Sequence, residues 1–566
     1  MTTTQRRYLV ATAPLTGAAI MIIEILGAKM LAPYIGTSLF VWTAQISVTM
    51  IALAAGYALG GHIADRSAGS AAKSESAKSG SAKFPLGRRR EAPPNPPSGN
   101  LALPDAPTAP APTAAPLYLC ILGAALALVL GTLVRENVAL ACLQLDLRLG
   151  SFLASCALFF VPLCLLATVP PILVRNLAAG LDSIGRTVGR LSAISTIGSV
   201  LGTLAIGYIL IPNFSNTTIM LATAAALALI SLVYLLAWRA NKTSVPGAPI
   251  FLAFTIAAFS IPALLQNPLH VPPGRFTEIH RANSGYGLLQ VLDDKNENLR
   301  YYLNDILIQN IYDRATKQSA AEFTHMLHGL ARAYTPQPIH DALCIGMGVG
   351  IVPMQFAAEG VQVDIVEINP AVVPLAEKYF DFAPARIRTL AINDARPWLA
   401  AAANKTRQYD TIILDAFLGD APPSHLMTRE AFAEMKRHLR PDGTLVINSF
   451  GALEPGNNFF TASLEKTLAA IFATVRLHTT NDGNNYYIAT DRPDARPLRA
   501  PDLTNVPPYL RANIATLHAT TRTLADAAPN AIVLTDNYNP VDYHDARNRE
   551  KDRRTLALGI LAGRDE

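Results

Sequence analysis

The sequence has few charged residues and no cysteine pattern that binds metal or builds a disulfide framework. Asp, Glu, Lys and Arg make up only 16% of the 566 residues, whereas soluble domains carry about 25%. The five cysteines form neither a CxxC pair nor a Cys/His ligand spacing, so we expect no metal site. The net charge of +5 is modest and much of the basic excess lies in one loop. Nucleic-acid binding is therefore not indicated.

Long apolar runs are what the sequence has in abundance, and they lie within residues 8–265. A helix needs about 20 apolar residues to cross a bilayer core. Seven segments meet this length, at 8–28, 39–61, 116–134, 151–174, 191–212, 216–238 and 248–265. The first is not read as a signal peptide, because further spans follow it directly and no cleavage pattern ends it. We therefore expect an α-helical polytopic membrane domain.

Residues 66–115 differ in composition from the segments on either side. They are rich in Ser, Ala, Lys and Pro and contain Arg88, Arg89 and Arg90, which predicts a disordered basic loop. Helices one and two then occupy 1–65, and helices three to seven occupy 116–266. The positive-inside rule places the basic loop in the cytoplasm. Seven spans would put the C-terminal half outside the cytoplasm. A nucleotide cosubstrate is expected in the cytoplasm, so we expect the C-terminal half on the cytoplasmic side. The helix count leaves this side open.

Glu24 is an ionisable residue inside the first predicted span. Such residues are costly in a membrane and usually face a partner or a cavity. Glu24 either marks a substrate path or forms a structural ion pair with Lys29. Both interpretations stay open at the level of sequence.

From residue 275 onward the sequence reads as a soluble α/β protein. A hairpin over 285–303 and a strand over 307–311 predict a small β subdomain at 275–315. Five strands then alternate with helices over 316–550, at 342–346, 363–368, 387–392, 410–415 and 443–448. Alternation of this kind predicts a mostly parallel sheet with helices on both faces. Ligands bind such sheets at the carboxyl ends of the strands.

Polar residues and glycines follow four consecutive predicted strands. The first strand leads into a GxGxG loop, where glycines allow a ligand to approach the backbone. An acid after the second strand can accept hydrogen bonds from ribose hydroxyls. The set consists of Gly346, Gly348, Gly350, Glu367, Asn393, Asp394 and Asp415. The alternative is that Glu367 and Asp394 cap the helices that follow them.

In this order the motifs resemble S-adenosylmethionine-dependent methyltransferases in general and spermidine synthases in particular. The finer match rests on residues 284–287 (SGYG), on Gln309 and on residues 409–415 (YDTIILD). The apolar half is similar to bacterial proteins described as fused transporter/spermidine synthases. The residues that carry this likeness are Glu24, Gly27, Pro33, 36–42, Gly56, Tyr57, Gly60, Gly61, Asp65 and Arg66, with 415–420, Pro423, His425, Leu426, Thr428 and 534–540 in the soluble half.

The resemblance implies a fold and an activity. The fold is a polytopic helical domain followed by an α/β class I methyltransferase-like Rossmann domain with a small N-terminal β-hairpin subdomain. The activity is transfer of an aminopropyl group from decarboxylated S-adenosylmethionine to a putrescine-like amine, in the inner (plasma) membrane of a bacterium. Asp415 is expected to accept the amine proton. Tyr286, Gln309, Asp420 and His425 are expected at the amine substrate. The resemblance leaves a homodimer open.

The sequence departs from the family at several acidic positions. The aspartate of the glycine loop is replaced by Val349, and a second catalytic-loop aspartate is replaced by Leu418. An Asp-Glu pair is replaced by Ser319 and Ala320. Loss of acids weakens binding of a dicationic amine, because a buried unpaired ammonium carries a large desolvation cost.

Two other functions stay open from the sequence. One is a methyltransferase that uses S-adenosylmethionine itself. The other is a membrane transporter whose soluble domain senses a nucleotide or a polyamine.

Overall fold

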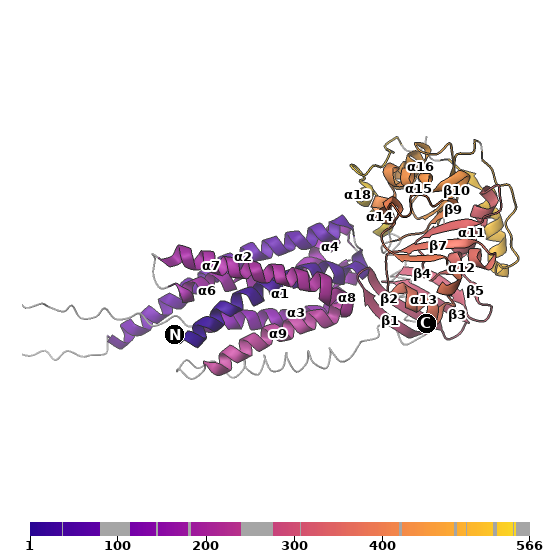
Figure 1. Cartoon of the computed structure of the whole chain (residues 1–566). Coiled ribbons are helices and arrows are strands. Elements are labelled where there is room, and N and C mark those ends of the chain that lie inside the picture. Colours follow the sequence, from indigo (N-terminus) through magenta and orange to yellow (C-terminus); the bar gives the residue numbers. More distant parts are fainter. Residues whose placement is uncertain are drawn as a thin grey trace, which may run out of the picture.

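A computed structural model of the chain shows a helical bundle joined to an α/β domain (Figure 1). The structure describes residues 1–36, 38–79, 114–142, 145–178, 183–238, 275–305, 307–417, 422–479, 484–493, 495–523, 529–546 and 548–550. The N-terminus lies at the end of the bundle that is far from the α/β domain.

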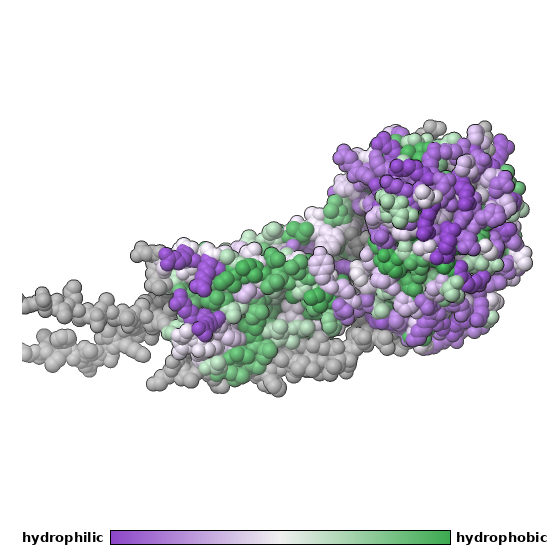
Figure 2. Space-filling view, in the orientation of Figure 1, coloured by the Kyte–Doolittle hydropathy of each residue, from purple (hydrophilic) through white to green (hydrophobic). Residues whose placement is uncertain are grey.

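Within the described residues, the bundle contains six helical segments that are long and apolar enough to cross a membrane. They run over Thr3–Ala32, Leu39–Arg66, Ala115–Cys142, Leu147–Leu177, Ile184–Asn213 and Asn216–Ala237. The first six predicted segments all fall in these helices, and the seventh, 248–265, lies outside the described residues. In the hydropathy view the apolar surface is concentrated on the bundle, whereas polar residues dominate the α/β domain (Figure 2).

The individual helices of the bundle are partly broken by short π-helical turns. Their bounds are α1 Thr3–Ile35, α2 Leu39–Ser79, α3 Ala115–Cys142, α4 Leu147–Ser155, η1 Cys156–Phe160, α5 Val161–Ala167, α6 Val169–Leu177, α7 Ile184–Ala205, η3 Ile206–Leu210, α8 Ile211–Asn213 and α9 Asn216–Ala237. Helix α2 continues to Ser79, so the prediction of a disordered loop from residue 66 is wrong for its first part. The Ala, Lys and Glu residues in this stretch are good helix formers.

A small antiparallel sheet follows the bundle. Its strands are β1 Phe276–Ser284, β2 Gly287–Asp294, β3 Leu299–Asn304, β4 Leu307–Asp313 and β5 Gln318–Ser319, in that spatial order. The predicted hairpin is confirmed as β2–β3, and its turn is held by Asp294, which accepts the backbone N–H groups of Asn296 and Glu297. The subdomain is larger than the predicted hairpin because β1 and β5 extend the sheet.

The second sheet has eight strands in the order β13-β11-β12-β10-β9-β6-β7-β8. Their bounds are β6 Asp341–Ile345, β7 Gln362–Glu367, β8 Thr389–Ile392, β9 Tyr409–Leu414, β10 Leu439–Ser449, β11 Thr474–His478, β12 Asn485–Thr490 and β13 Thr521–Arg522. Strands β10, β9, β6, β7 and β8 are parallel, and β12 runs antiparallel between β10 and β11. The predicted Rossmann-like sheet is therefore confirmed.

Helices cover both faces of this sheet. They are α11 Glu322–Tyr334, α12 Ile351–Ala358, α13 Val372–Tyr379, α14 Ala395–Ala400, α15 Arg429–Arg437, α16 Phe459–Ala469, α17 Pro508–Ala519 and α18 Val541–His544. Alternate residues of β6 pack into different cores: Ala342 and Cys344 into one, Leu343 and Ile345 into the other. The chain order reverses between β6 and β9, and a crevice for ligands forms outside the strand ends at such a switch point.

Candidate active site

A pocket of about 940 Å³ lies at the carboxyl ends of β6, β7, β8, β9 and β10. The small sheet supplies a further wall from β4 and from the β1–β2 turn. Most of the predicted site residues line it: Gly346, Gly348, Glu367, Asn393, Asp394, Asp415, Tyr286, Gln309 and His425. Asp420 lies outside the described residues. Gly350 lies outside the pocket lining.

The glycine loop after β6 needs glycine for two different reasons. At Gly346, φ is +85°, and a Cβ atom there would lie 2.2 Å from the carbonyl oxygen of Asp415. This close approach lets the first and fourth parallel strands end side by side at the pocket. At Gly350 a Cβ atom would lie 2.3 Å from the ring of Phe382. Gly350 therefore serves the packing of α12, and its predicted role at the cosubstrate is not supported by its position.

Glu367 ends β7 and is 8% exposed. Its carboxylate oxygens accept the backbone N–H groups of Met347 at 3.0 Å and Asn369 at 2.8 Å. Burial raises the pKa of Glu367, and these backbone hydrogen bonds act against that rise. The carboxylate thus holds the glycine loop and faces the pocket, and each oxygen keeps a second lone pair for a ligand.

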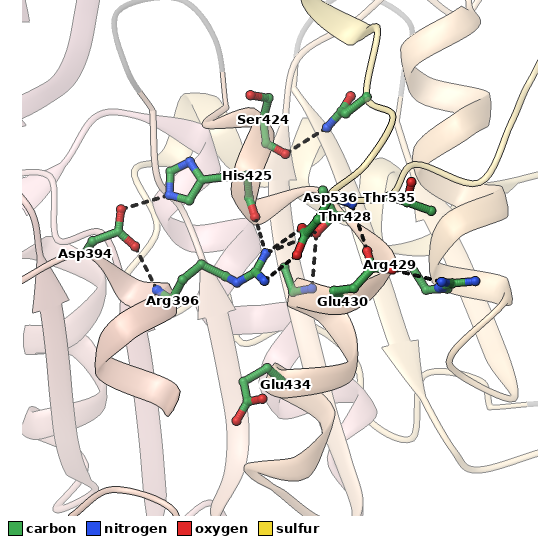
Figure 3. A network of polar contacts seen from close by, with 12 residues as sticks. Asp394, Arg396, Ser424, His425, Thr428, Arg429, Glu430, Glu434, Thr535 and Asp536 are labelled. Atoms are coloured by element: carbon green, nitrogen blue, oxygen red, sulfur yellow. Dashed lines mark hydrogen bonds and ion pairs between the residues drawn. The ribbon is translucent and has the colours of Figure 1, made fainter. Parts of the chain in front are cut away.

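Asp394 caps a helix, as the alternative reading of the sequence proposed. One carboxylate oxygen accepts the backbone N–H of Arg396 at 2.8 Å, at the start of α14. The other lies 2.9 Å from Nε2 of His425 (Figure 3). The neighbouring Asn393 accepts the backbone N–H of Asp394 through its own side-chain oxygen at 2.8 Å. Both residues still line the pocket.

Asp415 follows β9 and is partly buried in the pocket. Burial raises the pKa of Asp415 to about 6, and the negative charge of Glu367 adds to this, while a hydrogen bond from Asn448 acts against it. Asn448 Nδ2 donates to Asp415 Oδ1 at 2.8 Å. Asn484 Nδ2 donates to Asn448 Oδ1 at 2.8 Å. The oxygen of Asn448 is therefore occupied, and its amide group is directed at Asp415.

Sequence reasoning missed Asn448 and Asn484. Asn448 lies near the end of β10, next to β9 in the sheet, so the rule that found the other strand-end residues also applied to it. Asn484 precedes β12, which is paired with β10 only in the folded chain. Both line the pocket.

His425 is held by a polar network that reaches the C-terminal segment (Figure 3). Arg396 donates to the carbonyl oxygen of His425 at 2.8 Å and binds Asp536 through both guanidinium nitrogens, at 2.9 and 2.7 Å. Thr428 Oγ1 donates to the same carboxylate at 2.6 Å. The hydrogen bond from Arg396 is the main cause that lowers the pKa of Asp536 to about 2. The loop after β9 is thus tied to residues more than 100 positions away.

Among the positions where family acids are replaced, Val349, Ser319 and Ala320 lie outside the pocket lining, and Leu418 lies outside the described residues. Val349 is fully buried in the core of the sheet. Ser319 is buried, and its hydroxyl accepts the N–H of Ala321 at 3.1 Å. On this side the pocket is lined by apolar residues, among them Ala321 and Phe323. The lining also includes Glu454 and Asp545, and Asp545 is paired with Arg549 at 2.9 Å.

No group of three His, Cys, Asp or Glu residues is placed to hold a metal ion in the part of the chain that the structure describes. The pocket lining includes the carboxylates of Glu367, Asp394 and Asp415, which suit a cationic organic ligand.

The chain is similar to known transferases. It is 43% identical over 119 residues to the polyamine aminopropyltransferase of Vibrio vulnificus, a match covering 21% of this chain and 40% of that one. It is 28% identical over 323 residues to the N-terminal histidine N-methyltransferase of Emericella nidulans, covering 52% and 53%. A solved spermidine synthase of Thermotoga maritima is 18% identical, with a TM-score of 0.31, over 38% of this chain and 74% of that one. No family model matches.

The chain spans about half of the length, or less, of these two curated relatives. Both relatives transfer a group, one an aminopropyl group and the other a methyl group, as their names state. The relatives of this chain are thus transferases of the polyamine aminopropyltransferase and N-methyltransferase kinds.

Proposed function

We propose that the protein is a membrane-anchored transferase that moves an aminopropyl group from decarboxylated S-adenosylmethionine to an amine. The observation that carries this proposal is Asp415, a carboxyl with a pKa of about 6 that Asn448 orients in a pocket beside Glu367. The amine acceptor class comes from the likeness to a polyamine aminopropyltransferase. The six long apolar helices support the membrane anchor.

In this reaction the amine nitrogen attacks the carbon bonded to the sulfonium sulfur. A C–N bond forms, the C–S bond breaks, and the sulfur leaves as the neutral thioether of methylthioadenosine. The attacking amine has to lose a proton, and a free alkylammonium has a pKa of about 10.4. Asp415 accepts this proton and holds the nitrogen in line. Above pH 6 the side chain is a carboxylate and is ready for this role.

The residues of the first two parallel strands fit the adenosyl end of the cosubstrate. Glu367 presents acceptors to ribose hydroxyls, and Gly346 and Gly348 leave room for the ligand beside the backbone. Asn393 and Asp394 line the next strand end, where the base of a nucleoside lies in folds of this type. Tyr286, Gln309 and His425 line the remaining walls around the acceptor.

Methyl transfer from S-adenosylmethionine is the second candidate. The 28% likeness to an N-methyltransferase extends over 323 residues, more than the match to the aminopropyltransferase. The structure adds that Val349 packs in the core, so this loop position places no carboxylate beside the cosubstrate. S-adenosylmethionine carries a carboxylate that a neighbouring acid would repel.

The test is a product assay on the full chain purified in detergent. It is incubated with either donor and a panel of amines, and the nucleoside product is identified. Methylthioadenosine from the decarboxylated donor supports the proposal, and S-adenosylhomocysteine moves the protein to the methyltransferases. Asp415→Asn should reduce the formation of either product by about 10² to 10⁴. The matched control is Asp442→Asn, at an exposed position of β10 with φ +64°, a conformation that Asn tolerates.

A third outcome would favour the sensor. If neither donor gives a product although both bind, and if Asp415→Asn binds them as wild type does, the pocket detects a nucleotide without turning it over. The transferase proposal then fails.

A further inference from the structure

The six apolar helices have two chemically different ends. The direction of each follows from its contacts. Gly198 and Gly202 of α7 approach Pro14 and Ala18 of α1, so these two helices run parallel. Likewise, Gly56 and Gly60 of α2 approach Cys164 and Thr168. Helices α2 and α5–α6 therefore also run parallel to each other. Because α2 begins at Leu39, shortly after α1 ends at Ile35, this second pair runs opposite to the first.

The first end of the bundle holds the N-terminus. Aromatic rings from α1, α3 and the end of α9 pack together there. Tyr118 stacks on Tyr234 with ring centroids 3.8 Å apart, and Tyr8 lies 5.3 Å from Trp238. Helix α9 therefore ends beside the start of α1, at the end that lies far from the α/β domain in Figure 1.

The second end of the bundle carries the α/β domain. Lys29 Nζ, near the end of α1, donates to the carbonyl oxygen of Gly285 at 3.0 Å. Tyr543 packs on Phe40 with centroids 5.4 Å apart and accepts a hydrogen bond from Arg148 at 3.1 Å. The contacts come from three helix ends, at α1, α2 and α4, so the domain is seated across this end of the bundle.

Lys and Arg are distributed unequally between the two ends. At the first end, the described basic residues are Arg6, Arg7, Arg66, Arg175, Arg186 and Arg190. The sequence between α2 and α3, two helices that meet this end, also contains Lys83, Arg88, Arg89 and Arg90. At the second end, the helices and their connections hold Lys29, Arg135 and Arg148. All of these connections are shorter than about 60 residues, the range in which Lys and Arg set orientation.

We propose that the bundle spans the membrane with its first end in the cytoplasm, so the α/β domain and its pocket face the opposite, non-cytoplasmic side. Positive charge is retained on the cytoplasmic side during insertion, and the excess at the first end is large. This is the opposite of the side expected from the sequence, where the need for a nucleotide cosubstrate favoured the cytoplasm.

The chain connection agrees with this orientation. Ala237 ends α9 at the first end, and Phe276 begins β1 beside α8 at the second end. A helix of the length of α1 spans about 50 Å. The residues between Ala237 and Phe276 have to join ends separated by most of that length. The two ends of this connection therefore lie at opposite ends of the bundle, which puts β1 at the end away from the N-terminus.

The orientation has a consequence for the substrates, which rests on the proposed function. Tyr286 and Asp545 line the pocket, and each is within two residues of a contact with the bundle, at Gly285 and Tyr543. The pocket therefore lies close to the membrane face. An adenosyl sulfonium carries a permanent charge that a bilayer excludes. A transport step has to supply it on the side where the pocket lies.

Cysteine labelling of the full chain tests the orientation without using enzyme activity. Thr4→Cys marks the first end, and Lys405→Cys marks an exposed loop of the α/β domain. A membrane-impermeant maleimide is applied to spheroplasts of a bacterial expression host, before and after permeabilisation. The parent chain is the background control, because its cysteines are buried or partly buried. We expect at least tenfold more labelling of Lys405→Cys than of the parent in intact spheroplasts, and labelling of Thr4→Cys only after permeabilisation.

Labelling of Thr4→Cys in intact spheroplasts, or protection of Lys405→Cys there, overturns the proposal. Protease treatment of spheroplasts gives a second readout on the unmodified chain. External protease should remove the α/β domain and leave the N-terminal Arg6–Arg7 region intact, and survival of the domain also overturns the proposal. Because neither readout depends on turnover, an inactive protein with an external domain would refute only the proposed function.

Discussion

Replacing Asp415 by Asn should remove activity and at the same time stabilise the α/β domain at neutral pH. Asn has nearly the same shape as Asp, and its side-chain oxygen can still accept the hydrogen bond from Asn448. It lacks the negative charge that the pocket places beside Glu367 and away from water. The variant thus separates the chemical role of the carboxylate from its structural role.

The size of the effect follows from the pKa of Asp415. The folded protein has a value of about 6, against about 3.9 for an unfolded Asp. The folded state therefore binds this proton more tightly, so the free energy of unfolding is highest below pH 4 and falls as the pH rises from about 4 to 6. A difference of two pKa units corresponds to about 3 kcal/mol. Because Asp415 is only partly buried, we expect about 1 to 3 kcal/mol.

The assay compares thermal unfolding of wild type and Asp415→Asn at pH 4 and pH 8. At pH 8 the variant should unfold at a temperature higher by about 2 to 12 °C, since 1 kcal/mol shifts Tm by about 2 to 4 °C in domains of this size. At pH 4 the difference should vanish, because wild-type Asp415 is then protonated. Product formation should fall by about 10² to 10⁴, the usual contribution of a general base. Lower stability of the variant at pH 8, or retained turnover, would refute the reasoning.

Three further predictions concern single side chains. Glu367→Ala should weaken binding of adenosyl ligands at least tenfold in calorimetry, because it removes the ribose acceptors and releases the backbone of Met347; equal affinity would exclude Glu367 from the site. Asn448→Ala should raise the pKa of Asp415 further, so the acid limb of the profile of kcat/KM against pH should move above pH 6. If this limb does not move, Asn448 has no role in the reaction. His518 is buried, and neither ring nitrogen has a hydrogen-bond partner among the described residues. Burial lowers the pKa of His518 to about 4. The free energy of unfolding of the domain should therefore fall as the pH drops from about 6.5 to 4. His518→Leu should remove most of that pH dependence in urea titrations. If the free energy of unfolding of this variant still falls with pH as in wild type, other groups cause the pH dependence.

Several parts of the site were predictable because they depend on local sequence. The alternation of predicted helices and strands located the strand ends at which Glu367, Asp394 and Asp415 lie. All three side chains line the pocket. Parallel strands bring their carboxyl ends to one edge, so the sequence order of the motifs translated directly into a shared crevice.

Other parts of the site were decided by contacts that the sequence does not display. Gly350 belongs to the glycine motif, yet it meets Phe382 and lies outside the pocket lining. Val349 replaces an aspartate of the family's glycine loop, and its side chain lies in the hydrophobic core. The Asn448–Asn484 pair that orients Asp415 comes from β10 and the start of β12, which pair only in the folded sheet.

The sequence by itself determined the helical and α/β halves, the positions of the parallel strands along the chain and the acids at their ends, because hydropathy, periodicity and turn residues act over short distances. Only the tertiary structure decided which end of the bundle carries the pocket, how Asp536 and Arg396 hold His425, and what raises the pKa of Asp415. Each of these depends on residues that are far apart in the chain, and their distances and burial arise only when the elements pack.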